Sequence, residues 1–335
     1  MITRRLRWGL GAVAVAAVAV LLAAVVPNRV AEPEPSPPDG QVEEAPDPSG
    51  YFQTSPPGAW ASLPGDSDCA ARVHRSSWEP RPANYTPNNT MPPKAEVQQA
   101  LASRPRAAAE GYDSRWDGWL LPRVTGQHTG TTDENIQWAA CKWGISDNLL
   151  RAIAVRESTW VQYSVYPSGR CVEQFGCGDM VPEPSPATEV YCTAISQFGY
   201  DYRRDYPPGI CPETFGIAGV MSWEAPEWGP MADNQNGTFP FNRDSTAYAL
   251  DYLGSYLRGC QEGWLYWLGD QGGDYGPGDI WGCVGSWYSG DWKGDNALRY
   301  IRNVRTELDR RTWLTPAFRR FEPPCSGDLG CPAGF

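Results

Sequence analysis

One glutamate stands where a helix should place an apolar side chain. Segment 147–158 reads DNLLRAIAVRES, and its apolar residues recur at helical spacing until the stripe reaches Glu157. Burial beside apolar groups raises the pKa of a carboxyl group, and the partial negative charge at a helix C-terminus raises it further. A general acid for glycosidic cleavage requires such a raised pKa, so Glu157 is the candidate catalytic residue. The alternative, a glutamate that turns out to solvent at the helix end, stays open. The apolar stripe before it consists of Leu149, Leu150, Ile153 and Ala154.

The rest of the composition offers few other catalytic groups. The 335 residues include only two histidines, His74 and His128, so catalysis by Ser-His-Asp or Cys-His groups has little to draw on. The sequence has no HExxH or CxxC metal motif, no phosphate-binding loop and no dinucleotide fingerprint. Its 28 basic and 39 acidic residues give a net charge of −11, which disfavours nucleic acid as a partner. We therefore expect no cofactor, no metal and no nucleic-acid ligand.

Residues 1–31 indicate export. Arg4, Arg5 and Arg7 precede a 19-residue uncharged run, Trp8–Val26. The core of a signal peptide has about 7–15 residues and a membrane span about 20, so the run fits a cleaved signal peptide or a single uncleaved membrane anchor. In both cases the arginines stay inside, and the remainder of the chain is extracellular or part of the cell envelope.

The ten cysteines agree with an oxidising compartment, because an even number in an exported protein indicates disulfides. We expect all ten to be paired. Spacing distinguishes only two local pairs, Cys171 with Cys177 and Cys325 with Cys331, each closing a short loop that contains glycine. The other pairings stay open.

Composition divides the remaining chain into four parts. Residues 32–58 hold eight prolines and six acids, which predicts an extended linker. Residues 59–130 are irregular, with one short helix expected at Lys94–Ser103, and we expect them to pack on the main domain. Residues 131–313 form that domain, and residues 314–335 are a tail that contains two cysteines.

Helical spacing dominates the main domain, so we predict a mainly α fold. A helix is expected at Asp133–Trp143 after an N-cap at Thr132, and the helix with Glu157 follows an N-cap at Ser146. Two more helices are expected later, one capped by Asp244 and one opened by Asp295. An insertion rich in Gly, Pro and Cys separates the two pairs of helices over residues 163–212. The stripes of the two later helices hold Leu250, Leu253, Leu257 and Cys260, and Leu298, Ile301, Val304 and Leu308.

Residues 133–160 hold two short predicted helices, and the second ends in Glu157-Ser158. This segment resembles the start of the lysozyme-like lytic transglycosylase domain of bacterial soluble transglycosylases. That family joins the two helices through a K-x-G-[LIV] turn, here residues 142–145, and ends the second helix in a catalytic Glu-Ser pair. Residues 215–221 stand at the place of its GLMQ-like segment, and residues 286–290 at the place of its AYNAG-like segment.

The resemblance covers residues 131–313, and the cysteine and tryptophan content is similar to that of exported actinobacterial members. It implies a lysozyme-like helical domain with a disulfide-rich loop insertion. The implied activity is cleavage of the bond between N-acetylmuramic acid and N-acetylglucosamine in peptidoglycan glycan strands, with Glu157 both donating and accepting the proton. We expect the protein to act as a monomer. The substrate-binding residues suggested by the motifs, and by the affinity of aromatic rings for sugar C–H faces, are Ser158, Trp160, Gly216, Gly219, Met221, Trp223, Trp287 and Tyr288.

Departures from the family pattern keep other functions open. The Gln that follows the family's Leu-Met pair has no clear counterpart here, and its Tyr-Asn pair appears as Trp287-Tyr288. A hydrolysing muramidase or chitinase-like glycosidase would need a second carboxylate or a held water. The acids available for that role are Glu224, Glu227 and Asp244. A non-catalytic cell-wall-binding protein with the same fold is the third hypothesis.

Overall fold

A computed structural model describes residues 44–104, 106, 111–164, 171–172, 175–181, 184–198, 206–223, 236–271 and 273–322. The chain divides into two units, Met1–Pro38 and Asp39–Phe335, and all described residues belong to the second. The predicted signal or anchor, the pair Cys325–Cys331 and the acids Glu224 and Glu227 lie outside the described residues. Within the described ranges, no helix has the length and apolar character needed to cross a membrane.

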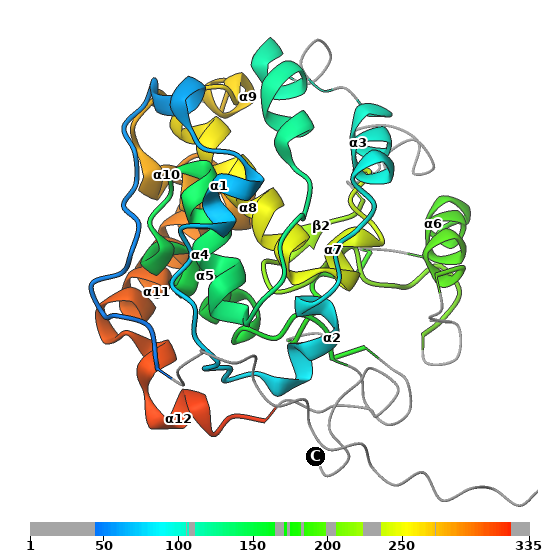
Figure 1. Ribbon diagram of the computed structural model, residues 1–335. Helices are drawn as coiled ribbons and strands as arrows, with labels where there is room; N and C mark the ends of the chain where they lie inside the picture. The colour runs from blue at the N-terminus through cyan, green and yellow to red at the C-terminus, as the bar shows by residue number, and fades with distance from the viewer. Residues whose placement is uncertain are drawn as a thin grey trace, which may run out of the picture. The chain divides into compact units, whose positions relative to one another are not determined.

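The second unit is mainly α-helical, as predicted. Its central helices are α4 (Thr132–Trp143), α5 (Asp147–Ser158), α8 (Thr246–Gln261), α10 (Ile280–Ser289) and α11 (Asp295–Arg310). Helix α4 packs against α5 and α8, while α11 packs against α5 and α10 (Figure 1). The stripes predicted for α5 and α8 are buried, with every apolar residue at most 4% exposed. Burial of these stripes brings the C-terminal end of α5 against α11.

The two helices that lead to Glu157 begin close to the predicted positions. The N-cap of α4 is Thr131 rather than Thr132, because the Thr131 hydroxyl and the Glu134 carboxylate form a reciprocal capping box. Ser146 caps α5 as predicted. The prediction for α8 is also wrong by one residue. Its cap is Ser245, since the preceding residue ends the short helix α7 (Phe241–Asp244).

Residues 59–130 cover α4 and contribute to the main core. The disulfide Cys69–Cys141 joins them to α4, and the side chains of Trp116 and Leu120 pack in the same cluster as the central helices. All twelve residues of α4 are consequently buried. The elements of this region are short: η1 (Ala59–Ser62), α1 (Asp66–Ala70), η2 (Pro82–Asn84), α2 (Tyr85–Asn88), α3 (Lys94–Ala102), η3 (Trp116–Leu120) and η4 (Leu121–Arg123).

The described end of the predicted linker, residues 44–58, is attached to the helices instead of forming a free spacer. The backbone N–H groups of Tyr51 and Phe52 donate to the Asp147 carboxylate at 2.9 and 3.2 Å. Asp147 also pairs with Arg151, which is fully buried. The prediction rested on proline and acid content alone, and composition does not reveal that a buried carboxylate on α5 supplies the partner for this segment.

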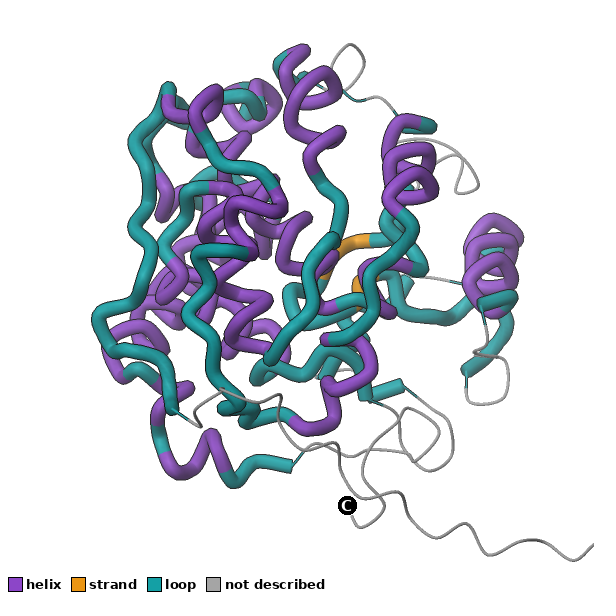
Figure 2. The backbone as a smooth tube through the Cα atoms, viewed as in Figure 1, coloured by secondary structure: helices purple, strands orange, loops and turns teal. Residues whose placement is uncertain are grey.

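The insertion forms an apolar cluster of its own, held by the disulfides Cys171–Cys177 and Cys192–Cys211. The first of these pairs is the one predicted from spacing. Helix α6 (Pro186–Ser196) belongs to this region and lies apart from the central helices in Figure 1. The two-residue strands β1 (Thr214–Phe215) and β2 (Val220–Met221) pair antiparallel, forming the small hairpin drawn in orange in Figure 2.

A fourth disulfide, Cys260–Cys283, joins α8 to α10. Eight of the ten cysteines are therefore paired, and no described cysteine is free. Four disulfides indicate an oxidising, extracytoplasmic environment, in agreement with the predicted export. The remaining described elements are α9 (Tyr266–Gly269), η8 (Thr312–Leu314) and α12 (Pro316–Arg319).

Candidate active site

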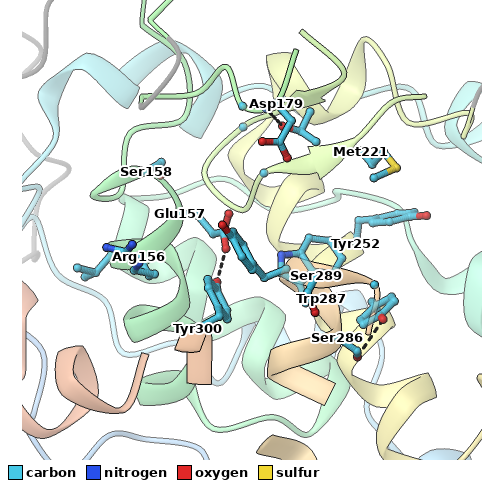
Figure 3. Close-up of a pocket in the computed structure, with 18 of the residues that line it drawn as sticks. Arg156, Glu157, Ser158, Asp179, Met221, Tyr252, Ser286, Trp287, Ser289 and Tyr300 are labelled. Carbon is cyan, nitrogen blue, oxygen red and sulfur yellow. Dashed lines mark hydrogen bonds between the residues drawn. The ribbon is translucent and has the colours of Figure 1, made fainter. Parts of the chain in front are cut away.

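Glu157 lies at the end of α5, on the wall of a groove. The helix stops at Thr159, which adopts the left-handed conformation with φ of 54°. The carboxylate of Glu157 lines a groove with a volume of about 1590 Å³ (Figure 3). The apolar stripe of α5 therefore directs this carboxylate to a groove, and the alternative of a glutamate turned to bulk solvent does not hold.

Tyr300 of α11 holds one oxygen of this carboxylate. Its hydroxyl donates a hydrogen bond to Glu157 Oε1, marked by a dashed line in Figure 3. Tyr300 is only 3% exposed, and burial together with the nearby Glu157 charge raises its pKa well above the usual range. The hydroxyl therefore stays protonated and remains a donor. The Tyr300 ring also stacks face to face on Tyr288, with centroids 4.6 Å apart.

Gly219 lies against the other carboxylate oxygen. It ends the turn between β1 and β2 with φ of 62°, and a Cβ atom on it would lie 2.8 Å from Glu157 Oε2. Two side chains hold this turn: the Ser158 hydroxyl donates to the Ile217 carbonyl, and the Gln162 side-chain carbonyl accepts from the Ile217 N–H, both at 3.0 Å. The turn thus places a residue without a side chain beside Oε2, which leaves that oxygen open to the groove.

Aromatic rings of α10 line the same groove. The Trp287 indole N–H donates to the Ala218 carbonyl at 3.1 Å, which ties the ring to the hairpin, and the ring meets Tyr256 edge-on with centroids 5.1 Å apart. The next residue, Tyr288, is 52% exposed, whereas Trp287 is half-buried. Figure 3 shows Trp287 in the groove together with Glu157. The groove therefore combines an acidic group with apolar ring faces.

Burial raises the pKa of Glu157 to about 7, and this is the strongest influence on it. The hydrogen bond from Tyr300 lowers the pKa, the charge of Asp179 raises it, and the charge of Arg156 lowers it. The side chain keeps partial solvent exposure through the groove, so a ligand can reach it. A carboxyl group that titrates near pH 7 can donate a proton and take one back at neutral pH.

Seven of the nine predicted site residues line the groove. Ser158 and Gly216 serve structural roles at its edge. The Ser158 hydroxyl is bonded to the hairpin, and a Cβ atom on Gly216 would lie 2.3 Å from the Asn242 carbonyl oxygen. The other members expose groups to the groove. The full set is Glu157, Ser158, Gly216, Gly219, Met221, Trp287 and Tyr288.

Trp160 and Trp223 are placed in the two apolar clusters, and both are 0% exposed. The Trp160 indole N–H donates to the Arg151 carbonyl at 2.9 Å. The Trp223 ring packs on Tyr191, with centroids 5.7 Å apart. A ring without exposed surface cannot stack on a ligand, so we withdraw these two tryptophans from the substrate-binding set. Tryptophan content alone does not separate a core ring from a ligand platform.

Sequence reasoning missed Tyr300, Gln162 and Asp179, the last of which lines the groove from the insertion. Only Tyr300 could have been found from the sequence, because it stands at helical spacing from the apolar Val304 and carries a hydroxyl group on an aromatic ring. The predicted stripe of α11 passed instead through Leu298, which is 40% exposed. The buried residues of α11 are Ala297, Tyr300, Ile301 and Val304.

Asp244 and the two histidines are not among the described residues that line the groove. Asp244, considered above as a second acid, pairs with Arg243 and is not among the described residues that line the groove. His128 is buried, with its Nδ1 bonded to Asn135, and neither histidine is found among those lining residues. The described residues contain no cluster of three or more His, Cys, Asp or Glu side chains that could hold a metal ion.

Comparisons with protein-family models, with curated proteins and with solved structures found no match to this chain.

Proposed function

We propose that this chain is an exported peptidoglycan lytic transglycosylase with Glu157 as its acid and base. The observation that carries the proposal is the placement of the Glu157 carboxyl group. Tyr300 holds one of its oxygens, Gly219 leaves the other open, and its pKa is raised to about 7 in a groove lined by aromatic rings. The four disulfides support an extracytoplasmic site of action, where peptidoglycan is found.

In the proposed reaction, the Glu157 carboxyl group donates its proton to the glycosidic oxygen, and the bond from that oxygen to the anomeric carbon of N-acetylmuramic acid breaks. The bonding electron pair leaves with the oxygen, and positive charge develops over the anomeric carbon and ring oxygen. The 6-hydroxyl oxygen of the same sugar then bonds to the anomeric carbon and gives its proton to the Glu157 carboxylate. No water is consumed, and Glu157 is returned to its acid form.

The size of the groove suits a polymer of sugars. Sites for drug-sized ligands have volumes of about 300–1,000 Å³, whereas this groove has a volume of about 1590 Å³. The net charge of −11 gives no long-range attraction to an anionic cell wall, so recognition must be short-range, through the groove itself. The proposed reaction needs no cofactor or metal, and a monomer carries all of its proposed groups.

We further infer a lysozyme-like fold for the helical unit. Three segments far apart in the chain carry the resemblance, namely residues 157–158, 215–221 and 286–290, and each contributes residues to the one groove. Their convergence supports the fold because the resemblance depends on sequence order alone, which does not require the three segments to meet.

The proposal is tested by incubating the purified protein with isolated peptidoglycan and measuring the masses of the released fragments. We expect muropeptides with 1,6-anhydromuramoyl ends, lighter by one water than hydrolysed ends. The rate should fall as the pH rises through about 7, because Glu157 must start as an acid. Fragments that carry solvent oxygen would indicate a hydrolysing glycosidase, and binding without release would indicate a non-catalytic wall-binding protein.

A further inference from the structure

Asp179 faces the groove from the insertion, on the loop that follows Cys177. Both Asp179 and Glu157 line the groove, and Figure 3 shows the Asp179 carboxylate on the opposite side of the groove from the end of α5. Asp179 is exposed in the structure, so its carboxylate is accessible to a ligand. The charge of Asp179 also acts on Glu157, since it is one of the influences that raise the pKa of that residue.

The backbone around Asp179 is held in place by β1. The Asp179 N–H donates to the Thr214 hydroxyl at 2.9 Å, and its carbonyl accepts from the Glu213 N–H at 2.7 Å. The preceding residue, Gly178, donates its N–H to the Thr214 carbonyl at 3.0 Å, and a Cβ atom on it would lie 1.8 Å from the Thr214 hydroxyl oxygen. The disulfide Cys171–Cys177 closes the loop immediately before it. Several contacts therefore hold the backbone of Asp179 at the groove.

We propose that Asp179 is a second catalytic carboxylate of this site, which stabilises the positive charge that develops on the sugar ring as the glycosidic bond breaks. This inference rests on the proposed function. In this arrangement the Asp179 carboxylate faces the sugar ring from across the groove, while the Glu157 carboxyl group faces the leaving oxygen. The Asp179 carboxylate forms no bond with the sugar and moves no proton, so the atoms and electrons balance as in the reaction above. A negative charge at this place favours the transition state because positive charge develops on the ring as the bond breaks.

The proposal also predicts a change in pH dependence. Among the described residues, the charged and titratable groups that act on Glu157 are Tyr300 from α11, Arg156 from its own helix and Asp179 from the insertion. The β1–β2 turn presents Gly219 to it, which carries no charge. Removing the Asp179 charge takes away an influence that raises the pKa of Glu157, so the pH at which activity is lost should move to a lower value.

The test compares the wild type with Asp179→Asn, Asp179→Glu and the control Asp309→Asn, all as full-length protein on isolated peptidoglycan. Asp309 is an exposed acid on α11 that is not among the described residues lining the groove. We expect Asp179→Asn to lower the rate by about 10-fold or more and to shift the alkaline limb of the pH–rate profile to lower pH. Asp179→Glu should recover part of the rate, Asp309→Asn should match the wild type, and all products should keep 1,6-anhydro ends.

The outcomes separate this inference from the proposed function. If the wild type releases no fragments, the proposed function fails and the role of Asp179 fails with it. If the wild type cleaves and Asp179→Asn matches Asp309→Asn in rate and pH profile, the inference about Asp179 alone is overturned. It is also overturned if the wild-type products carry solvent oxygen and Asp179→Asn abolishes them, because Asp179 would then be a base that activates water. Equal unfolding temperatures of the four proteins show that differences in rate come from the site and not from loss of folding.

Discussion

The hydroxyl of Tyr300 donates a hydrogen bond to Oε1 of Glu157, although the two residues are 143 positions apart in the sequence. The packing of α11 against α5 makes this contact. It divides the two carboxylate oxygens by role, since Oε1 is held inside the protein and Oε2 lies beside Gly219 at the groove. The proton that Glu157 gives and takes back should therefore be carried by Oε2.

Removing the Tyr300 hydroxyl should change the pH dependence of activity. The hydrogen bond lowers the pKa of Glu157, so Tyr300→Phe should raise that pKa and move the alkaline limb of kcat/KM to higher pH. This shift is opposite in sign to the one expected for Asp179→Asn. The rate should also fall by about 10-fold, because the carboxyl group loses its orientation. Tyr85→Phe, at an exposed tyrosine away from the groove, is the control. An unchanged profile for Tyr300→Phe would mean that the contact plays no part in catalysis.

A methyl group at position 219 should block the site. Gly219→Ala places a Cβ atom 2.8 Å from Glu157 Oε2 and also strains a backbone with φ of 62°. Backbone strain of this kind costs about 1 kcal/mol. Gly58→Ala is the matched control, since its φ is 87° and a Cβ atom there meets nothing within 4 Å. We expect similar losses in unfolding free energy for both variants but loss of peptidoglycan cleavage for Gly219→Ala only. Equal activities would show that Oε2 is not the reacting oxygen.

The tryptophans should divide into ligand-contacting and core residues. Trp287→Ala should raise KM for peptidoglycan fragments, because it removes a ring from the groove. Trp160→Ala should cost about 3–5 kcal/mol of unfolding free energy, because it empties a fully buried site. Denaturant unfolding and steady-state kinetics on both variants measure the two effects. The reverse result, a changed KM with intact stability for Trp160→Ala, would return Trp160 to the substrate-binding set.

The disulfides should contribute more to stability the longer the loop they close, with a logarithmic dependence on loop length. Cys69–Cys141 spans 72 residues and Cys192–Cys211 spans 19. Replacing both cysteines of the first pair by serine should cost about 4 kcal/mol, and replacing those of the second about 3 kcal/mol. Urea unfolding of the two double variants measures the difference.

Thiol titration of the denatured, unreduced wild type should find no free sulfhydryl, and two or more per chain would contradict full pairing.

The sequence predicted the parts of the fold that depend on local periodicity. The apolar stripe of α5 could be read directly, and it directed attention to Glu157 because a carboxylate interrupts it. The partners of Glu157 come from elements joined only by tertiary packing. Tyr300 was hidden because the predicted α11 stripe ran through Leu298, two positions before it, whereas the buried face runs through Ala297 and Tyr300. Asp179 was hidden because its segment has no periodicity, and its place depends on a disulfide and on hydrogen bonds to Thr214.

Residues 44–58 also show that composition alone does not predict tertiary contacts. Their proline and acid content predicted a solvated spacer, yet Tyr51 and Phe52 bind the carboxylate of Asp147. Composition reports how a segment behaves alone, while the buried pair of Asp147 and Arg151 creates a partner that exists only in the folded protein.

The most direct test of the central claim is the mass of the sugar ends released from peptidoglycan by the wild type and by Glu157→Gln. Glutamine keeps the shape of the side chain but cannot donate or accept the proton, so the release should fall by a factor on the order of 10² or more. Equal thermal unfolding of the two proteins confirms that the fold is intact. We expect 1,6-anhydromuramoyl ends from the wild type and almost none from Glu157→Gln. Undiminished release by Glu157→Gln, or no release by the wild type, would contradict this expectation.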